Sequence, residues 1–397
     1  MPIDAKSDGQ TQKELPSFQG THVSDIATGH AIHDTYTGFL PPLLPRLIET
    51  FSLTRTEAGL LSTFLQLPSL MQPFIGLYGD RFNLRWVVIL APAVTAALMS
   101  ILGWSQSYLL LAVILLAAGV SSAAFHATAP VLAGSLSGRE MGKGMGFWMV
   151  GGELGRALGP IIIVSALQFM DLRTSAWLMI PGILASLLLA VRLRNVPAPE
   201  TKPRPQVGWA ILRTILPLFL PLMGLIAARA LMLTALSTYL PTYLTETGSA
   251  IWTAGAALTL VEIAGIIGAL LGGLASDRYG RNPVLIVTMT ASTIFLLLFL
   301  HLSGLMQLGA LLLAGFFSLS IAPVIMAIVQ ETYPDQRSLA NGVYMAMSFL
   351  IRSAATILLG LLGDMVGLYW AFMLSAAVMV FGLPLIRRLP TPPMTES

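Results

Sequence analysis

The sequence predicts an all-α integral membrane protein with twelve transmembrane helices in two pseudo-symmetric six-helix bundles. The 397-residue chain is 55% hydrophobic and only 10% charged, and its mean hydropathy is +0.78. Soluble domains carry about 25% charged residues, so this chain has too little charge to cover a surface in water. Apolar stretches of roughly 18 residues or more, enough to cross the bilayer core as a helix, recur along the chain. A motif repeated across the midpoint predicts the division into two bundles.

The repeated motif lies at matching places in the two halves. Gly76-Leu-Tyr-Gly-Asp80-Arg81 and Gly273-Leu-Ala-Ser-Asp277-Arg278 each follow a long apolar run, and their aspartates are 197 positions apart. Arg156 and Arg352 are separated by 196 positions. Two related bundles in tandem are typical of carriers, which hold a substrate between halves that rock against each other.

Apolar runs bounded by glycine, proline or charge predict the helices in order. The first bundle is expected at 22–48, 56–79, 86–104, 108–134, 143–170 and 175–193. The second is expected at 209–243, 252–275, 283–302, 306–330, 340–362 and 367–387. The proline-rich, charged segment between them predicts an extended linker. The predicted parts are a tail 1–21, a bundle 22–194, a linker 195–208, a bundle 209–388 and a tail 389–397.

Basic residues predict the orientation. If both termini are cytoplasmic, sixteen lysines and arginines lie on the inner side and only Arg46, Arg55 and Arg173 lie in outer loops. Cytoplasmic loops of membrane proteins carry such an excess. The first twenty residues contain no apolar segment of the kind found in signal peptides, so they are expected to form a cytoplasmic tail.

Composition also excludes several classes of function. The chain has no cysteine, which excludes disulfides, thiolate metal sites and cysteine nucleophiles. It has no phosphate-binding loop, which argues against a pump driven by ATP. The net charge of +3 is explained by basic loops better than by a nucleic-acid partner. We therefore expect a monomeric protein that is not an enzyme, without cofactor, whose partners are a small molecule, protons and the lipid bilayer.

Three ionisable residues lie close together in the first predicted helix. His30, His33 and Asp34 are spaced so that Asp34 and His30 share a helix face. Ionisable groups within a membrane usually face a cavity or a partner, and histidine titrates near neutrality. The preferred interpretation is a proton relay, with His126 as a further member. Two histidines and an acid could instead bind zinc or nickel, as in a metal carrier or membrane metalloenzyme, or simply pack; no metal site is predicted.

A second pair of charges lies in the fifth predicted helix. Glu153 and Arg156 are three residues apart and can reach each other. Glu153 is interpreted as a proton-binding acid, and Arg156 as its partner or as an anchor for an anionic substrate, to which arginine can donate two hydrogen bonds. The alternative is a static pair that only stabilises the fold.

The second half carries its own intramembrane charges, Arg229, Glu262 and Arg352. Because Arg352 matches Arg156 in the repeat, two arginines are expected on opposite sides of one cavity, which favours an anionic substrate. Arg229 could instead extend toward the cytoplasmic end of its helix. The predicted substrate-binding residues are Arg156, Arg352, Arg229, Glu262, Gln66, Tyr239 and Tyr243.

The paired Gly-x-x-x-Asp-Arg loops resemble the signature of the major facilitator superfamily, over about residues 22–388, although Asn83 replaces a common glycine in the first copy. His30–Asp34, Phe125-His126 and Gly151–Pro160 are similar to the fosmidomycin-resistance group of that superfamily. The resemblance implies the major facilitator fold and an inner-membrane exporter driven by protons. The expected function is antiport of a small anionic or amphiphilic compound such as a drug. The alternative is a proton-coupled importer of an organic acid or siderophore-like solute.

The resemblance also assigns roles to glycines and to loop charges. Gly146, Gly155 and Gly159-Pro160 resemble the antiporter motif of exporters, although Ile163-Val164 replaces its usual trailing glycines. Glycines four apart also clear a helix face for close packing, which is the plainer interpretation. The loop charges are expected to form a cytoplasmic latch, or else a fixed loop anchor. These predicted gating residues are Asp80, Arg81, Arg85, Asp277, Arg278 and Arg281.

Overall fold

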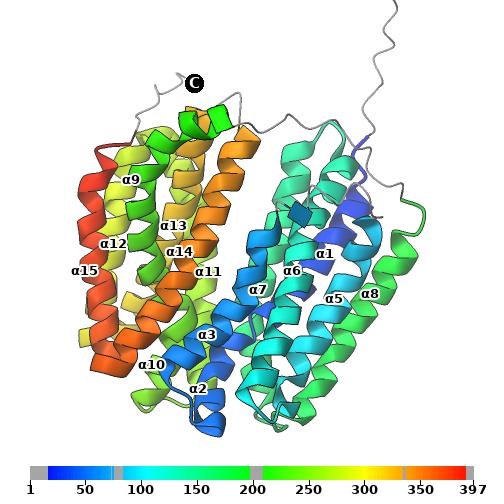
Figure 1. The fold of residues 1–397 in the computed structure, drawn as a ribbon, viewed down its shortest axis with the longest axis horizontal. Helices are drawn as coiled ribbons and strands as arrows, with labels where there is room; N and C mark the ends of the chain where they lie inside the picture. Colours follow the sequence, from blue (N-terminus) through cyan, green and yellow to red (C-terminus); the bar gives the residue numbers. More distant parts are fainter. Residues whose placement is uncertain (1–16, 73, 76–83, 197–208, 334–336, 390–397) are drawn as a thin grey trace, which may run out of the picture.

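The computed structural model describes residues 17–72, 74–75, 84–196, 209–333 and 337–389, and within these ranges every regular element is a helix. The helices stand side by side in two groups, α1 to α8 and α9 to α15 (Figure 1). This confirms the predicted all-α fold in two bundles. Ten helices of the described chain are long and apolar enough to span a membrane. The first two predicted spans are divided into shorter helices and are not among these ten.

The helix bounds follow the predicted order closely. The N-terminal bundle contains α1 (Gly20–Thr37), α2 (Leu40–Phe51), α3 (Arg55–Gln66), η1 (Leu67–Met71), α5 (Leu84–Ser100), η3 (Ile101–Trp104), α6 (Tyr108–Ser137), α7 (Met141–Ala166), η4 (Thr174–Leu178) and α8 (Met179–Arg192). The C-terminal bundle contains α9 (Trp209–Thr234), η5 (Ala235–Tyr239), α10 (Leu240–Glu246), α11 (Ile251–Tyr279), α12 (Arg281–His301), α13 (Gly304–Thr332), α14 (Arg337–Val366) and α15 (Leu368–Ile386). Most of the predicted linker lies outside the described residues.

Pro41 and Pro241 interrupt the first helix of each bundle at matching places. Proline has no backbone N–H, and its ring clashes with the carbonyl four residues earlier. For Pro41 that residue is Thr37, at which α1 ends. For Pro241 it is Ser237, which lies inside the π-helical segment η5. At equivalent positions, the repeated Leu-Pro pair therefore ends α1 in one bundle and accompanies a π-helical segment within a continuous helix in the other, and both sites border the cavity described below.

Glycines bring α1 and α7 into backbone contact. A Cβ atom added at Gly151, Gly155 or Gly159 would lie 2.2–2.4 Å from the carbonyl oxygen of Ala27, Ala31 or Thr35 respectively. Such distances leave no room for any side chain. The predicted close approach along this glycine face is confirmed, and it fixes the position of α1, which carries the histidines.

Gly155→Ala is therefore expected to destabilise the protein. Its Cβ would meet the Ala31 oxygen at 2.2 Å, and overpacking of this kind typically costs about 1–3 kcal/mol. Gly146→Ala on the same helix is the matched control, because nothing lies within 4 Å of its added Cβ. Thermal unfolding in detergent should give a lower midpoint for Gly155→Ala alone. Equal midpoints for the two variants would contradict the packing.

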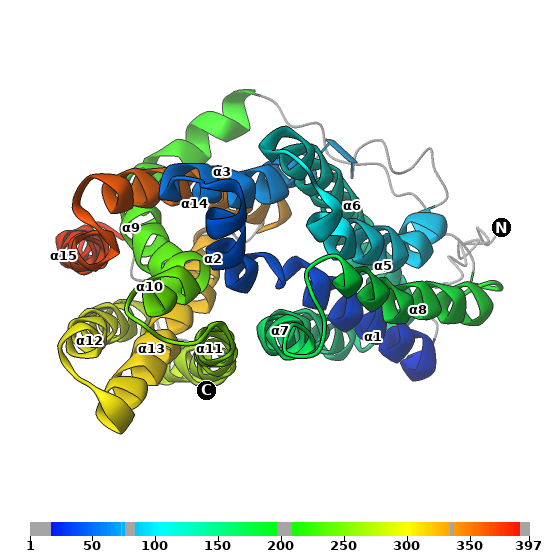
Figure 2. The ribbon, with the colours of Figure 1, turned by 90° about the horizontal axis from the view of Figure 1, so that it is seen from below.

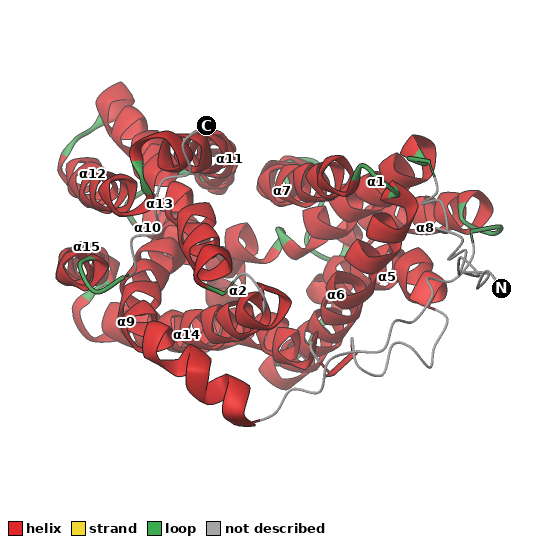
Figure 3. Cartoon of the chain, turned by 90° about the horizontal axis from the view of Figure 1, so that it is seen from above, coloured by secondary structure: helices red, strands yellow, loops and turns green. Residues whose placement is uncertain are grey.

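The two bundles are joined at one end of the molecule. Seen from below, α2 and α3 lie against α10 and α14 of the other bundle (Figure 2). The view from above shows α7 and α11 facing each other across the centre (Figure 3). Among the described residues, the hydrogen bonds between bundles all lie in the half of the molecule nearer α2 and α10, such as Trp252 Nε1 to Ser165 Oγ at 3.1 Å. We call this the sealed end; it is opposite the end at which α1 begins.

Candidate functional site

A polar cavity of about 300 Å³ lies between the bundles, where the predicted carrier site should be. Asp34, His126 and Arg156 line it from the N-terminal bundle, and Glu262 and Arg352 line it from the C-terminal bundle. Ionisable side chains at this depth are costly unless they have partners or a function. The cavity therefore brings together ionisable side chains from five helices and both halves.

Asp34 stands at the centre of a cluster of three histidines. Its Oδ1 lies 2.8 Å from His33 Nδ1 and 3.5 Å from His126 Nε2, and its Oδ2 lies 3.3 Å from His30 Nε2. The Nε2 atoms of His30 and His126 are 3.2 Å apart. His30 and His33 are buried behind the cavity wall, whereas Asp34 and His126 reach its surface. The structure thus unites all four residues that the sequence proposed as a relay.

Aromatic rings hold the two buried histidines. His30 stacks on Trp148 with ring centroids 3.6 Å apart, and His33 stacks on Phe125 at 4.5 Å. On its far side, His33 Nε2 is 3.1 Å from Thr95 Oγ1, which in turn hydrogen-bonds Ser121. These contacts leave the imidazoles little freedom, so the polar atoms around Asp34 are held in place before any ligand or proton arrives.

The two matching arginines do face the same cavity. Arg156 forms an ion pair with Glu153, as the sequence predicted, and Arg352 donates to Ser237 Oγ at 3.1 Å. The Nε atoms of both arginines are buried without a hydrogen-bond partner. Each guanidinium therefore has donor capacity that the described protein atoms do not use.

The other predicted substrate contacts divide into two groups. Gln66 lines the cavity with Glu262. Tyr239 does not: it is fully buried, and its hydroxyl oxygen lies 3.0 Å from both the Thr356 and the Arg55 carbonyl oxygens, between which its one hydrogen is shared. Tyr243 stacks on Phe372 in the hydrophobic core, so it is likewise absent from the lining.

Arg229 also departs from the expected position. It lies well inside α9, and neither the cavity lining nor a helix end includes it. Its Nε is buried without a hydrogen-bond partner, so the alternative of extension toward a cytoplasmic helix end does not fit either.

The loop charges bond within single bundles. Asp80 and Arg81 lie outside the described residues. Arg85 donates to the carbonyls of Arg194 and Val196 at 2.6 and 3.1 Å, beyond the end of α8. Asp277 pairs with Arg281 at 2.6 Å, not with the adjacent Arg278, which lies over the Tyr279 ring. Arg281 also pairs with Glu331. In this conformation the described loop charges fit a fixed anchor.

A bridge between bundles that the sequence did not predict closes the sealed end. Arg55 donates to both carboxylate oxygens of Glu246, at 2.9 and 3.0 Å. Asp364 accepts from the backbone N–H groups of Arg55 and Thr56, at 2.8 and 2.9 Å, and from the Thr56 hydroxyl at 2.6 Å. A carboxylate at a helix N-terminus is favoured by the helix dipole. A helix of one bundle is thus capped by an acid from the other.

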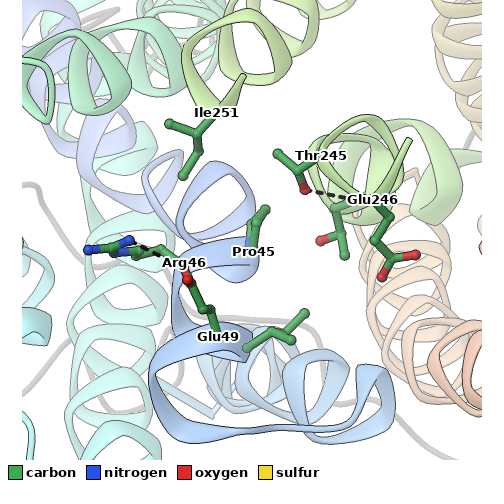
Figure 4. Close-up of a pocket in the computed structure, with 8 residues that line it drawn as sticks. Pro45, Arg46, Glu49, Thr245, Glu246 and Ile251 are labelled. Atoms are coloured by element: carbon green, nitrogen blue, oxygen red, sulfur yellow. Dashed lines mark hydrogen bonds and ion pairs between the residues drawn. The ribbon is translucent and has the colours of Figure 1, made fainter. Parts of the chain in front are cut away.

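The outer face of this bridge is a cleft between α2 and α10. Figure 4 shows Arg46 and Glu49 on one side and Thr245 and Glu246 on the other, with Ile251 above them. Glu246 therefore belongs both to this cleft and to the bridge with Arg55. The cleft and the central cavity are separate spaces on either side of the seal.

Comparisons with known proteins agree with this geometry. A model of the Major Facilitator Superfamily matches residues 26–273 and 222–397. The fosmidomycin resistance protein of Escherichia coli (strain K12) is 25% identical over 372 residues, covering 90% of each chain. The MFS-type transporter YfnC of Bacillus subtilis (strain 168) is 25% identical over 370 residues, again covering 90% of each.

A solved structure shares the fold. A bacterial homologue of the human lysosomal transporter Spinster, in an inward-facing and unoccupied conformation, superposes with a TM-score of 0.75. The two chains are 15% identical, and the match covers 93% of this chain and 96% of the other. At this identity the likeness concerns the fold alone.

Proposed function

Because the chain belongs to the major facilitator superfamily, whose members are secondary transporters, we propose that it is a proton-coupled antiporter. It exports a small anionic or amphiphilic compound, such as a drug, by alternating access. The observation that carries this proposal is the cavity between the bundles, which holds a carboxylate among histidines on one side and two arginines from opposite halves. Carriers of this architecture place their sites at the interface of their repeats.

The histidine cluster is the proposed proton site. Asp34, His30, His33 and His126 share hydrogen-bonding partners, and histidine takes up and releases protons near neutral pH. Glu153 is the second proposed acid, because its ion pair with Arg156 can be exchanged when a substrate binds the arginine. Proton and substrate would then compete for one connected set of charges.

The proposed location is the cytoplasmic membrane, with both termini in the cytoplasm and the monomer as the working unit. The excess of basic residues in the predicted inner loops supports this orientation. The sealed end then faces outward, and the cavity is reached from the cytoplasm. The predicted latch at Asp80 and Asp277 would form only after the cytoplasmic side closes.

Flux in inside-out vesicles tests the direction. A proton gradient that is acidic inside should drive uptake of the substrate against its concentration gradient if the chain exports. A candidate substrate is found first by thermal-shift screening of drugs, phosphonates and organic acids. Uptake that requires the opposite gradient would instead support the proton-coupled importer of an organic acid or siderophore-like solute. Uptake indifferent to pH would contradict proton coupling in either direction.

Arg156→Ala is expected to weaken the binding of an anionic substrate more than the binding of a neutral one. A hydrogen bond to a charged group contributes about 1.5–3 kcal/mol, which corresponds to roughly 10- to 150-fold in affinity. A neutral analogue should lose far less. Arg46→Ala is the control, because that arginine is exposed, pairs with Glu49 and does not line the cavity. Equal losses for anion and neutral analogue would show that Arg156 acts only through the fold.

A further inference from the structure

We propose that His30, Asp34 and His126 form a binding site for a divalent transition-metal ion of the Zn²⁺ class, with an open fourth position toward the central cavity. Their ligand atoms all lie within 4.8 Å of one another. The two histidine Nε2 atoms are 3.2 Å apart; His30 Nε2 lies 3.3 Å from Asp34 Oδ2, and His126 Nε2 lies 3.5 Å from Asp34 Oδ1. A tetrahedral zinc site with bonds of about 2.0–2.1 Å places its ligand atoms about 3.3–3.4 Å apart. The two imidazole nitrogens and the carboxylate oxygen next to each of them are therefore already about as far apart as the ligand atoms of such a site.

The hydrogen bonds around the cluster fix which imidazole nitrogens can bind a cation. His30 Nδ1 is 2.8 Å from the Trp148 carbonyl oxygen, and His126 Nδ1 is 2.9 Å from the Ser122 carbonyl oxygen. A carbonyl oxygen only accepts, so each Nδ1 carries the hydrogen. In the neutral imidazoles each Nε2 atom therefore has no hydrogen and carries a lone pair. Two nitrogen lone pairs and a carboxylate face one another, and this arrangement requires a cation among them: either a proton or a metal ion.

The surroundings match those of histidines that bind metals. Such histidines donate their other ring N–H to a backbone carbonyl or carboxylate, as His30 and His126 do here. His33 donates to Asp34 Oδ1 at 2.8 Å and so orients the carboxylate without being a ligand. Arg156 on the cavity wall has its charge compensated by Glu153.

The donor set selects the class of ion. Two imidazole nitrogens and one carboxylate suit Zn²⁺, Co²⁺ or Ni²⁺, whereas Mg²⁺ and Ca²⁺ prefer oxygen ligands throughout. Asp34 and His126 line the cavity, so an ion can enter from it, and a water or substrate atom can take the fourth position. If Asp34 carries protons as proposed above, a bound ion would occupy the same atoms and block exchange.

Titration of the purified full chain tests this site. The protein, in detergent and carrying a tag without histidine, is stripped of metal and titrated with Zn²⁺ by calorimetry and with Co²⁺ by visible absorption. We expect one ion per chain, the absorption of a tetrahedral cobalt site, and no comparable binding of Mg²⁺. His126→Gln should lower the affinity by more than the roughly 10- to 100-fold that loss of a supporting residue costs.

His22→Gln is the matched control, because His22 lies on the same helix near Asp25 and away from the cluster. It should leave binding unchanged. Absence of stoichiometric Zn²⁺ binding by the parent chain would overturn the proposal, and so would unchanged affinity in a folded His126→Gln or loss of binding in His22→Gln. If His126→Gln fails to fold, the parent chain alone decides: an octahedral Co²⁺ absorption spectrum would also overturn the proposal. If Zn²⁺ binds but proton-coupled exchange continues, the metal site is supported and the proposed proton role of Asp34 is contradicted.

Discussion

Asp34→Asn is expected to abolish pH-driven exchange while leaving the protein folded. The carboxylate is the one anionic group that contacts all three histidines, at 2.8, 3.3 and 3.5 Å. Asparagine is nearly the same shape but has no charge and cannot release a proton. Uptake into inside-out vesicles under an imposed pH gradient should fall to the level of vesicles without the protein.

Asp25→Asn is the matched control for this result. Asp25 lies on the same helix beside His22, 3.8 Å away, and neither residue lines the cavity. It should retain pH-driven uptake. Binding of substrate, followed by thermal shift, should survive in both variants. Full pH-driven uptake by Asp34→Asn would remove this residue from the proton path and shift the role to Glu153.

Asp364→Ala is expected to open the sealed end. It removes three hydrogen bonds to the start of α3 and leaves those backbone N–H groups uncapped. Loss of a helix cap costs about 1 kcal/mol. Together with the weakened Arg55 bridge, the expected change of one or two kcal/mol corresponds to about 5- to 30-fold in the conformational equilibrium. The fraction of molecules whose cavity is open at the sealed end should rise by this factor.

Labelling of an introduced cysteine measures that shift. The chain has no cysteine of its own, so Ser62→Cys, on the cavity wall, reports access alone. A membrane-impermeant thiol reagent, added on the side where Arg55 lies, should react faster with Ser62→Cys when Asp364→Ala is also present. Glu49→Gln is the control, since Glu49 pairs with exposed Arg46 on the same face. Equal labelling rates in all three backgrounds would show that Asp364 does not hold the end shut.

The sequence predicts much of the fold because its signals are local or repeated. The length of the apolar runs predicts the helices, and the repeated Asp-Arg motif with the matching Arg156 and Arg352 predicts the two bundles. Glycines spaced by four identify the face on which α7 meets α1, as the contacts of Gly151, Gly155 and Gly159 confirm.

The site was predicted best where its residues share one helix. His30, His33 and Asp34 are neighbours through helix spacing, and Glu153 reaches Arg156 in the same way. The bridge of Arg55 to Glu246 and Asp364 joins residues of separate helices in different bundles, and no local pattern specifies such a pair. The one available signal was that Arg55 is among the few basic residues of the predicted outer loops.

Tyr239 shows why residue type alone misleads. An aromatic hydroxyl near a broken helix fits a substrate contact, but this one lies in the interface of α3 with α14. A Cβ atom at Gly59 or Gly360 would be 2.2 or 2.5 Å from its oxygen, so the two glycines make the space that it fills. Which of two nearby spaces a side chain enters depends on packing by distant helices.

A reversible cross-link between the bundles tests alternating access most directly. A Cβ atom at Gly255 would lie 3.2 Å from the Cβ of Val164 on the other bundle. Disulfides need about 3.5–4.5 Å, so a small adjustment suffices. The double variant Val164→Cys, Gly255→Cys should lose exchange when oxidised and regain it on reduction, whereas each single variant is unaffected by oxidant. Undiminished exchange with the disulfide fully formed would contradict a cavity whose access changes sides by movement of the two bundles.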